Sequence, residues 1–259
     1  MAIKLIADPH GCFEDLSRGI SEEDVLVVLG DVLDLIDWVD VSGILSDVLG
    51  KDNLVRKLMS AVTAGPEAAV ALRDELLSPD GGYFEELLRL VNEQYAAFSR
   101  MLQDIGCRAY VIFGNGDIPD LLEASLNGAG EAILARGKVE IGGSVFGFVN
   151  GALYSPFQMP AEMDDEAYGS LLRELGPVDV LCTHIPPKLE AVTMDVVAGR
   201  PVEGSAYLLE YIEVNRPRIL YHGHVHQPAQ RELLVGETRV INVGYYKRQG
   251  YIHTHESSH

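Results

Sequence analysis

Five short clusters of aspartate, asparagine and histidine hold the residues of this 259-residue chain whose types and spacing could do chemistry. In chain order they are Asp8-Pro9-His10, Gly30-Asp31-Val32-Leu33-Asp34, Gly114-Asn115-Gly116-Asp117, Thr183-His184 and Gly223-His224-Val225-His226. Carboxylate oxygen, imidazole nitrogen and amide oxygen are ligands that hard and borderline divalent metals accept in proteins. Taken singly, each residue also suits a turn, a helix cap or a packed histidine, whereas the joint pattern indicates a metal site.

Each cluster follows a short apolar run that predicts a β-strand. The runs are residues 3–7, 25–29, 110–113, 178–182 and 219–221. Continuous apolar runs of this length are typical of strands buried on both faces, as in a sheet covered by helices. Because open α/β sheets bind ligands at the carboxyl ends of their strands, we expect the clusters to converge at one such edge.

The segments between these runs predict the remaining elements of the fold. Apolar residues at helical spacing predict helices over residues 13–20, 118–127, 164–175 and 205–214. Further strands are predicted at 145–149, 231–235 and 239–243, the last two joined as a hairpin by Gly236-Glu237. Mixed strands and helices with a terminal hairpin indicate an α/β layered sandwich.

A helical stretch interrupts this alternation between about residues 36 and 105. Candidate helices cover residues 41–49, 54–62, 67–77 and 83–102, with glycine and proline between them. We interpret residues 1–259 as a single domain with this helical insertion between its second and third core strands. The insertion could cover a site or form a dimer interface; an extra structural layer without a role in chemistry is the alternative.

The charge balance limits the partners of the chain. It has 20 Lys and Arg against 39 Asp and Glu, a formal net charge of -19. A field of that sign repels polyanions, so extended nucleic acid and anionic membrane surfaces are not expected as general partners. A phosphorylated substrate remains compatible if bound divalent cations reverse the local charge.

Cysteine use and the lengths of the apolar runs predict a cytoplasmic protein. Cys12, Cys107 and Cys182 are too few and too scattered for a disulfide framework or a zinc site. The first residues lack the apolar core of a secretory signal, and no apolar run approaches the roughly 18 residues that span a bilayer. We expect the tail, residues 253–259 with His253 and His255, to be solvated and mobile.

The five ordered clusters resemble the motifs of the calcineurin-like metallophosphoesterase superfamily. The resemblance covers residues 1–35 and about 106–245. It implies a four-layer α/β/β/α sandwich with a two-metal centre in which Asp31 bridges the ions. By position, the first metal would be held by Asp8, His10, Asp31 and His226. The second would be held by Asp31, Asn115, His184 and His224.

The resemblance also implies a reaction. Two divalent ions about 3.5–4 Å apart can clamp an in-line displacement at phosphorus, with a hydroxide shared between them as the nucleophile. Two such ions, less the carboxylates of Asp8 and Asp31 and one hydroxide, leave a net charge of about +1 that attracts phosphate. We assign Asp31, Asn115 and His224 to catalysis. Mn²⁺ is the metal that the resemblance favours, with Fe, Zn or Ni as alternatives.

The third cluster departs from the family pattern at Gly116. Many members have a histidine at this position, which faces the phosphate and the leaving group, and glycine has no side chain to donate a proton. Loss of a general acid costs about 10²–10⁴-fold in rate when the leaving group is poor. We therefore expect a phosphodiesterase, or an enzyme for activated esters, rather than one for simple alkyl monoesters.

Other residues are candidates for supporting roles. Asp34 and Asp117 are predicted to support the ligands from behind, with a purely structural role as the alternative. Leu35 stands where the family often has an arginine. Candidates with a simpler structural explanation are His222, Lys188, Asn150, Tyr154, Arg200, Lys247, Cys12 and Asp37.

The resulting hypothesis is a binuclear metal-dependent phosphoesterase acting on a small phosphate ester or a nucleotide. The alternative is a non-catalytic interaction scaffold on the same fold, and a homo-oligomer formed through the helical insertion is compatible with both. Relatives that act as scaffolds tend to lose ligands, whereas all seven ligand positions are filled here. A nuclease is disfavoured by the acidic composition.

Overall fold

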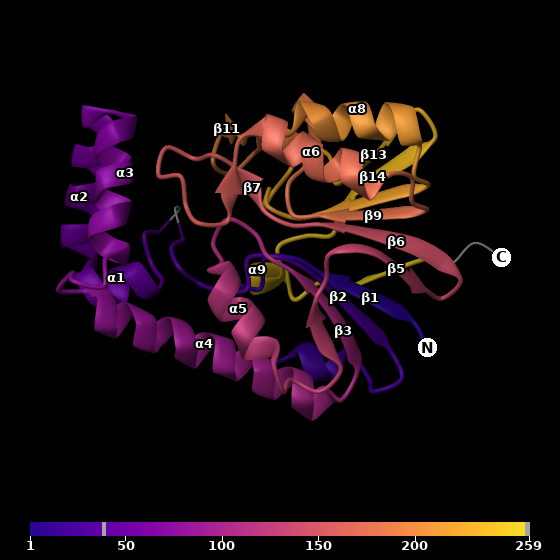
Figure 1. The fold of residues 1–259 in the computed structure, drawn as a ribbon, viewed down its shortest axis with the longest axis horizontal. Coiled ribbons are helices and arrows are strands. Elements are labelled where there is room, and N and C mark those ends of the chain that lie inside the picture. The colour runs from indigo at the N-terminus through magenta and orange to yellow at the C-terminus, as the bar shows by residue number, and fades with distance from the viewer. Residues whose placement is uncertain (38–39, 257–259) are drawn as a thin grey trace.

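The computed structural model describes residues 1–37 and 40–256 and contains two large β-sheets that pack face to face (Figure 1). The first sheet has the strand order β15-β1-β2-β3-β4. These strands are β1 (Ile3–Ile6), β2 (Val25–Leu29), β3 (Arg108–Ile112), β4 (Ala132–Leu134) and β15 (His253–Thr254). β1 to β4 run parallel, and β15 is antiparallel to β1 at the edge.

The second sheet has the strand order β13-β14-β12-β9-β6-β5. These strands are β5 (Gly137–Ile141), β6 (Ser144–Val149), β9 (Val180–Thr183), β12 (Ile219–His222), β13 (Glu232–Val235) and β14 (Thr238–Asn242). The four inner strands are parallel, and β5 and β13 pair antiparallel at the two edges. The pairing of β13 with β14 is the hairpin that the sequence predicts.

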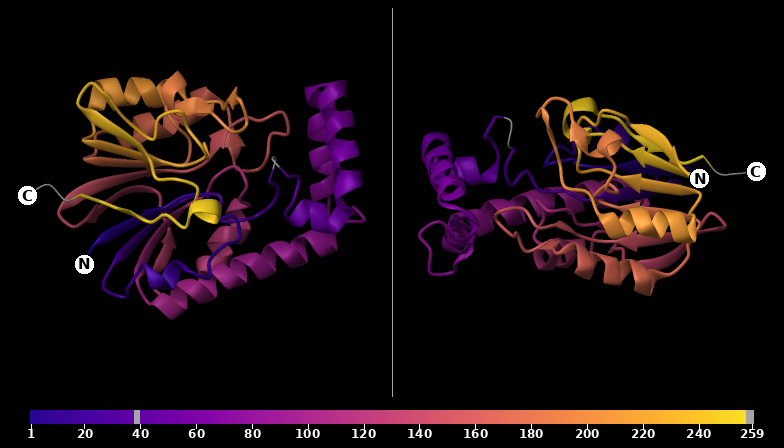
Figure 2. Two further views of the ribbon diagram at one scale, coloured as in Figure 1. Left: turned by 180° about the vertical axis from the view of Figure 1, so that it is seen from behind. Right: turned by 90° about the horizontal axis from the view of Figure 1, so that it is seen from above.

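Helices cover the outer face of each sheet, as the two further views in Figure 2 show. Side chains such as Val27 and Phe146 fill the core between the sheets. The alternate residue Leu26 packs against the insertion helices and α5 (Pro119–Leu126), whereas Leu220 packs against α6 (Asp165–Leu175) and α8 (Ala206–Asn215). The predicted α/β/β/α sandwich is confirmed, because strands buried on both faces require a layer on each side.

The segment between β2 and β3 is helical, as predicted. It contains α1 (Ile44–Leu49), α2 (Lys51–Ala64), α3 (Pro66–Leu77) and α4 (Phe84–Ile105). α4 lies along the first sheet and buries Val91, Tyr95 and Phe98 in the core there. α2 and α3 form a hairpin that stands away from the sandwich (Figure 1). None of the helices in the described residues is long and apolar enough to cross a membrane.

Several short elements differ from the sequence expectation. Residues 13–20 form one 3-10 turn, η1 (Leu16–Arg18), in place of the predicted helix, although Phe13, Leu16 and Ile20 are all buried in the core. Elements that the sequence did not predict are β4, β5, β7 (Ala152–Leu153), β8 (Glu162–Met163), α7 (Glu190–Thr193), β10 (Met194–Asp195), β11 (Arg200–Pro201), α9 (Tyr246–Gln249) and β15. They span two to five residues, too few to show a hydrophobic period.

The expectation of a mobile tail is wrong for its described part. β15 pairs with β1, and the His255 amide donates to the Ile3 carbonyl at 2.9 Å. The His255 side chain is buried, with Nδ1 2.9 Å from the Tyr221 hydroxyl. Pairing with the edge of the first sheet and a contact with the buried Tyr221 hydroxyl thus fix a segment whose polar sequence suggests exposure to solvent. Residues 257–259 lie outside the described part of the chain.

Candidate metal centre

The predicted ligands lie in five loops that follow parallel strands. Asp8 and His10 follow β1, Asp31 follows β2, Asn115 follows β3, His184 follows β9, and His224 and His226 follow β12. Since β1, β2 and β3 belong to one sheet and β9 and β12 to the other, both sheets present polar side chains at their carboxyl edges. The sandwich brings these two edges together, as the side-chain distances show.

Nitrogen and oxygen donors gather in two groups. Asp8, His10 and His226 form one, and their ligand atoms lie within 4.8 Å of one another. Asp31, His184 and His224 form the other, with the same limit. Asn115 joins the second group, because its Oδ1 lies 3.1 Å from His184 Nε2.

Asp31 lies between the two groups. Its Oδ2 is 3.7 Å from His10 Nε2 in the first group and 3.5 Å from His184 Nε2 in the second. Its Oδ1 accepts a hydrogen bond from the Gly116 amide at 2.7 Å. One oxygen is therefore held by the backbone while the other faces both donor groups, as a carboxylate shared by two cations requires.

Backbone carbonyls orient two of the imidazoles. His10 Nδ1 lies 2.9 Å from the Leu33 carbonyl, and His184 Nδ1 lies 2.8 Å from the Leu29 carbonyl. With Nδ1 donating, the neutral ring directs the lone pair of Nε2 towards the centre. His10 Nε2 is 3.3 Å from His226 Nε2, and His184 Nε2 is 3.1 Å from His224 Nδ1. Such converging nitrogen lone pairs fit cations, so the residues present suit a metal pair.

The backbone at four of these residues is left-handed. Asp8, His10, Asp31 and His224 have φ of 54°, 41°, 53° and 66°. For residues other than glycine this region is uncommon and costs about 1–3 kcal/mol each. Hydrogen bonds between the loops offset the strain, since the Asp8 amide donates to the Gly30 carbonyl and the His10 amide to the Asp31 carbonyl. Of the seven residues other than glycine with positive φ in the described part of the chain, four are predicted ligands, a pattern that fits strain held at a functional site.

Glycines in the motifs allow the donor side chains to lie close to neighbouring backbone. A Cβ on Gly114 would lie 2.3 Å from Asp31 Oδ1 and 2.5 Å from His184 Cε1. A Cβ on Gly223 would lie 2.5 Å from the Ala7 Cβ and 2.8 Å from Asp8 Oδ2. The glycines therefore make room for the donor side chains themselves.

Burial and neighbouring charges set the protonation of the donors. Burial lowers the pKa of His224 to about 3 and that of His226 to about 4, so both rings are neutral, the form that binds metal. Burial raises the pKa of Asp8 well above its ordinary value, and the nearby Asp31 raises it further. For Asp31 burial acts in the same direction, but His184, His10 and His224 together lower its pKa below the ordinary value.

The two carboxylates predicted to support the ligands have different surroundings. Asp117 is fully buried and accepts from the amides of Val32, Leu33 and Gly114 and from the Tyr95 hydroxyl at 2.9–3.2 Å. Burial and the nearby Asp31 raise its pKa to about 7. It joins the loops after β2 and β3 to α4. Asp34 instead forms an ion pair with Lys247 of α9 at 2.9 Å.

The candidates with simpler explanations lie outside the two donor groups. His222 is buried behind them, and its Nδ1 lies 3.0 Å from the Gly223 carbonyl. Asn150 accepts from the Phe113 amide and donates to the Ala135 carbonyl, so its side chain links the two sheets. Lys188 is exposed and pairs with Glu203 at 3.7 Å. The side chains of Tyr154, Arg200 and Cys12 are exposed.

Tyr245 contacts the donor groups and was not identified from the sequence. Its ring stacks on His226 with centroids 3.8 Å apart and an interplanar angle of 14°. It also meets the edge of the His10 ring, with centroids 5.8 Å apart. The only sequence signal is an aromatic residue three positions after β14, which is too common to assign a role.

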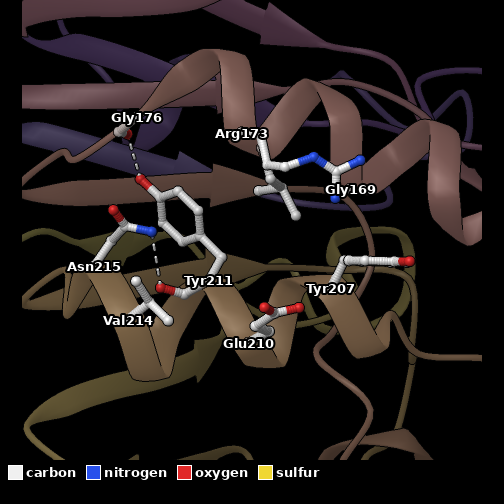
Figure 3. Close-up of a pocket in the computed structure, with 9 residues that line it drawn as sticks. Gly169, Arg173, Gly176, Tyr207, Glu210, Tyr211, Val214 and Asn215 are labelled. Carbon is white, nitrogen blue, oxygen red and sulfur yellow. Dashed lines mark hydrogen bonds between the residues drawn. The ribbon is translucent and has the colours of Figure 1, made fainter.

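Two cavities differ in their relation to this centre. The larger, about 260 Å³, lies between α6 and α8 on the outer face of the second sheet (Figure 3). Its lining includes Tyr207, Tyr211 and Val214, and none of the donor residues. The smaller, about 80 Å³, is lined by His226 and Tyr245 and therefore adjoins the donor groups.

The two-sheet α/β sandwich presents nitrogen and oxygen donors at its parallel strand ends, an arrangement that suits a metal-dependent hydrolase. The family model of calcineurin-like phosphoesterases matches residues 1–228, and the chain belongs to this family. Two solved structures share the fold. One crystal structure has 18% sequence identity and a TM-score of 0.62, covering 99% of this chain and 98% of that chain. The other, TT1561 of Thermus thermophilus, has 12% identity and a TM-score of 0.55, covering 98% and 97%. No curated protein matches the sequence.

Proposed function

We propose that the chain is a binuclear metal-dependent phosphodiesterase for small esters, including nucleotides. The observation that carries the proposal is the position of Asp31, one oxygen of which lies 3.7 Å and 3.5 Å from the imidazoles of two separate donor groups. A single carboxylate placed in this way serves two cations at once. A lone structural metal would need only one of the groups.

The ligand sets follow from the two groups. Asp8, His10 and His226 with Asp31 would hold the first ion, and His184, His224 and Asn115 with Asp31 the second. The mixed oxygen and nitrogen donors suit Mn²⁺, which we propose as the native metal, and also accept Fe, Zn or Ni. Two such cations would polarise the phosphoryl oxygens and lower the pKa of a water molecule.

The residues of the chain supply orientation rather than proton transfer to the leaving group. Asp31, Asn115 and His224 would be the catalytic residues, since they converge where the cations and the phosphate must meet. Gly116 offers only its amide, which holds Asp31, and a Cβ there would lie 3.2 Å from Asp31 Oδ1. Without an acid at this position, esters whose leaving group departs unaided are favoured.

The test compares bis(4-nitrophenyl) phosphate, 4-nitrophenyl phosphate and glycerol phosphate with Mn²⁺ added. We expect metal-dependent turnover that is fastest for the diester and lower by about 10²-fold or more for the alkyl monoester. Equal rates for the diester and the alkyl monoester would contradict the diester preference. Absence of turnover with all three substrates would contradict the catalytic function.

Two ligand variants locate the reaction in the proposed centre. Asp31→Asn should abolish turnover and binding of the metal pair, whereas Asn115→Ala should mainly weaken the second ion. Asp47→Asn, an exposed carboxylate on α1, is the matched control and should retain both. Metal content after dialysis and the rate with the diester are the measurements. Full activity and two bound metals in Asp31→Asn would show that the assignment is wrong.

An interaction scaffold remains the second candidate because of one surface feature. Val55, Met59 and Val62 of α2 are exposed by 36%, 64% and 57% and recur at helical spacing. Such an unpartnered apolar stripe suits a protein contact, including one with a second copy of the chain. Turnover that depends on Asp31 would favour the enzyme over the scaffold.

A further inference from the structure

The cavity of about 80 Å³ beside His226 adjoins the first donor group. His226 Nε2 lies 3.3 Å from His10 Nε2, so the cavity wall is itself part of that group. The other walls come from the loop after β2, the β10–β11 hairpin and α9 with its preceding residue. A substituent of a phosphate bound at the donor groups would therefore extend into this cavity.

Two carboxylates that line the cavity already have hydrogen-bond partners within the protein. Asp195 Oδ1 accepts from the amides of Val197 and Ala198, each at 2.9 Å. Asp37 Oδ2 accepts from the Tyr245 hydroxyl at 3.3 Å and lies 3.5 Å from Arg248 Nη2. Both carboxylates therefore already accept hydrogen bonds from the protein, Asp195 from backbone amides and Asp37 from the Tyr245 hydroxyl.

Three other side chains determine which chemical groups the cavity can bind. Val197 is 56% exposed and presents an apolar surface. Gln227 lines the cavity, and its side-chain amide makes no hydrogen bond within residues 1–37 and 40–256. The Arg248 guanidinium is 51% exposed at the rim, where its Nη2 lies 3.5 Å from Asp37 Oδ2 and 3.6 Å from Asp40 Oδ2. An apolar surface, a neutral donor and acceptor pair and a planar cation together match a flat ring with polar edges.

We propose that this cavity binds a planar aromatic or heteroaromatic substituent of the phosphoester whose phosphate lies at the metal centre. This inference rests on the proposed phosphodiesterase function. Val197 provides apolar contact, the Gln227 amide hydrogen-bonds to the edge of the ring, and the Arg248 guanidinium stacks on its face. The preferred substrates are therefore aryl or nucleoside-type esters rather than alkyl esters.

The test measures binding of two phosphonates to the Mn²⁺-loaded protein by calorimetry. Phenylphosphonate and methylphosphonate share the anionic group and differ only in the substituent, and neither is hydrolysed. We expect the phenyl compound to bind about tenfold more tightly, because the ring loses contact with water in the cavity. Val197→Asn should reduce this ratio to about threefold or less while leaving methylphosphonate binding within about twofold.

The control variant and the rate assay distinguish failure of this inference from failure of the proposed function. Val62→Asn makes the same change at a valine of 57% exposure on α2 and should retain the ratio. Hydrolysis of bis(4-nitrophenyl) phosphate is measured on the same samples. A protein that hydrolyses the diester but binds both phosphonates equally, or keeps the ratio in Val197→Asn, overturns this inference alone. A protein that neither hydrolyses the diester nor binds either phosphonate overturns the proposed function and the inference with it.

Discussion

Each predicted ligand depends on neighbouring groups for its orientation, and Tyr245 is such a group for two of them. Its ring is stacked on His226 and meets the edge of His10, while its hydroxyl donates to Asp37. The phenol is buried, and burial raises its pKa above the ordinary value, so it stays neutral. Tyr245 is therefore a positioning residue for the first donor group and does not itself bind the cation.

Replacing Tyr245 by leucine should affect one metal site more than the other. Tyr245→Leu removes the flat surface under His226, and we expect Mn²⁺ affinity at the first site to fall about 10–100-fold. Tyr245→Phe keeps the stacking and should bind within about threefold of wild type. Calorimetric titration with Mn²⁺ measures both steps, and Tyr154→Leu is an exposed control. Equal weakening of both steps would contradict the positioning role.

At the level of elements, α4 does more than cover the first sheet. The Tyr95 hydroxyl donates to Asp117 at 3.2 Å and accepts from the Ile118 amide at 2.9 Å. Through Asp117 it reaches the amides of the loop that carries Asp31. The insertion thus supports the donor loops through its last helix, while α2 and α3 stand away from the sandwich (Figure 2).

Removing this hydroxyl should destabilise the protein. Tyr95→Phe leaves the partly buried Ile118 amide without its acceptor and removes a donor to the buried Asp117, which together cost about 1–3 kcal/mol in the free energy of unfolding. Urea denaturation measures the change, and Tyr154→Phe is the exposed control. A Tyr95→Phe variant within about 0.5 kcal/mol of wild type would show that the link between α4 and the donor loops contributes little.

The stability of the protein should decrease in acid because of His255, which follows β15. Burial lowers the pKa of His255 below its ordinary value of 6.5, with Arg218 adding to the effect. A histidine with a lowered pKa in the folded state contributes stability that is present above the unfolded pKa and is lost as the pH falls. The free energy of unfolding should therefore fall between about pH 7 and pH 5 more steeply in wild type than in His255→Gln. Parallel curves for the two proteins would contradict this assignment.

At the level of the whole molecule, the charge of the chain and the charge of the centre have opposite effects. The net charge of -19 repels anions at a distance, whereas two bound cations would attract a phosphate at the donor groups. Surface charge is screened over about 8–10 Å at physiological salt, so the attraction by bound cations would outweigh the repulsion by distant carboxylates. The same cations would hold the two sheets together at their carboxyl edges.

Metal removal should therefore lower the thermal stability. A ligand present at 100 times its dissociation constant stabilises the folded state by about 2.7 kcal/mol. We expect Mn²⁺ to raise the melting temperature of the chelator-treated wild type, and Asp31→Asn to show little or no shift. Differential scanning calorimetry measures both. A wild-type melting temperature that is unchanged by Mn²⁺ and chelator would contradict binding at this centre.

The sequence alone predicts the core strands, the polar residues that follow them and the helical insertion, for a physical reason. Strands buried on both faces need continuous apolar runs, and parallel strands place the residues that follow them at one edge. The sequence therefore predicts that Asp8, Asp31, Asn115, His184 and His224, which follow these strands, lie at one edge. Helical periodicity predicted the insertion in the same way, because its helices are long enough to show a period.

Contacts between segments far apart in the chain were decided only by the tertiary structure. Tyr245 meets His10 across more than two hundred residues, and β15 pairs with β1 from the opposite end of the sequence. Whether one Asp31 oxygen faces both donor groups, and which side chains surround the cavity beside His226, depends on how the two sheets pack. Local sequence patterns report the period and burial of one element, whereas such contacts arise from the packing of several elements at once.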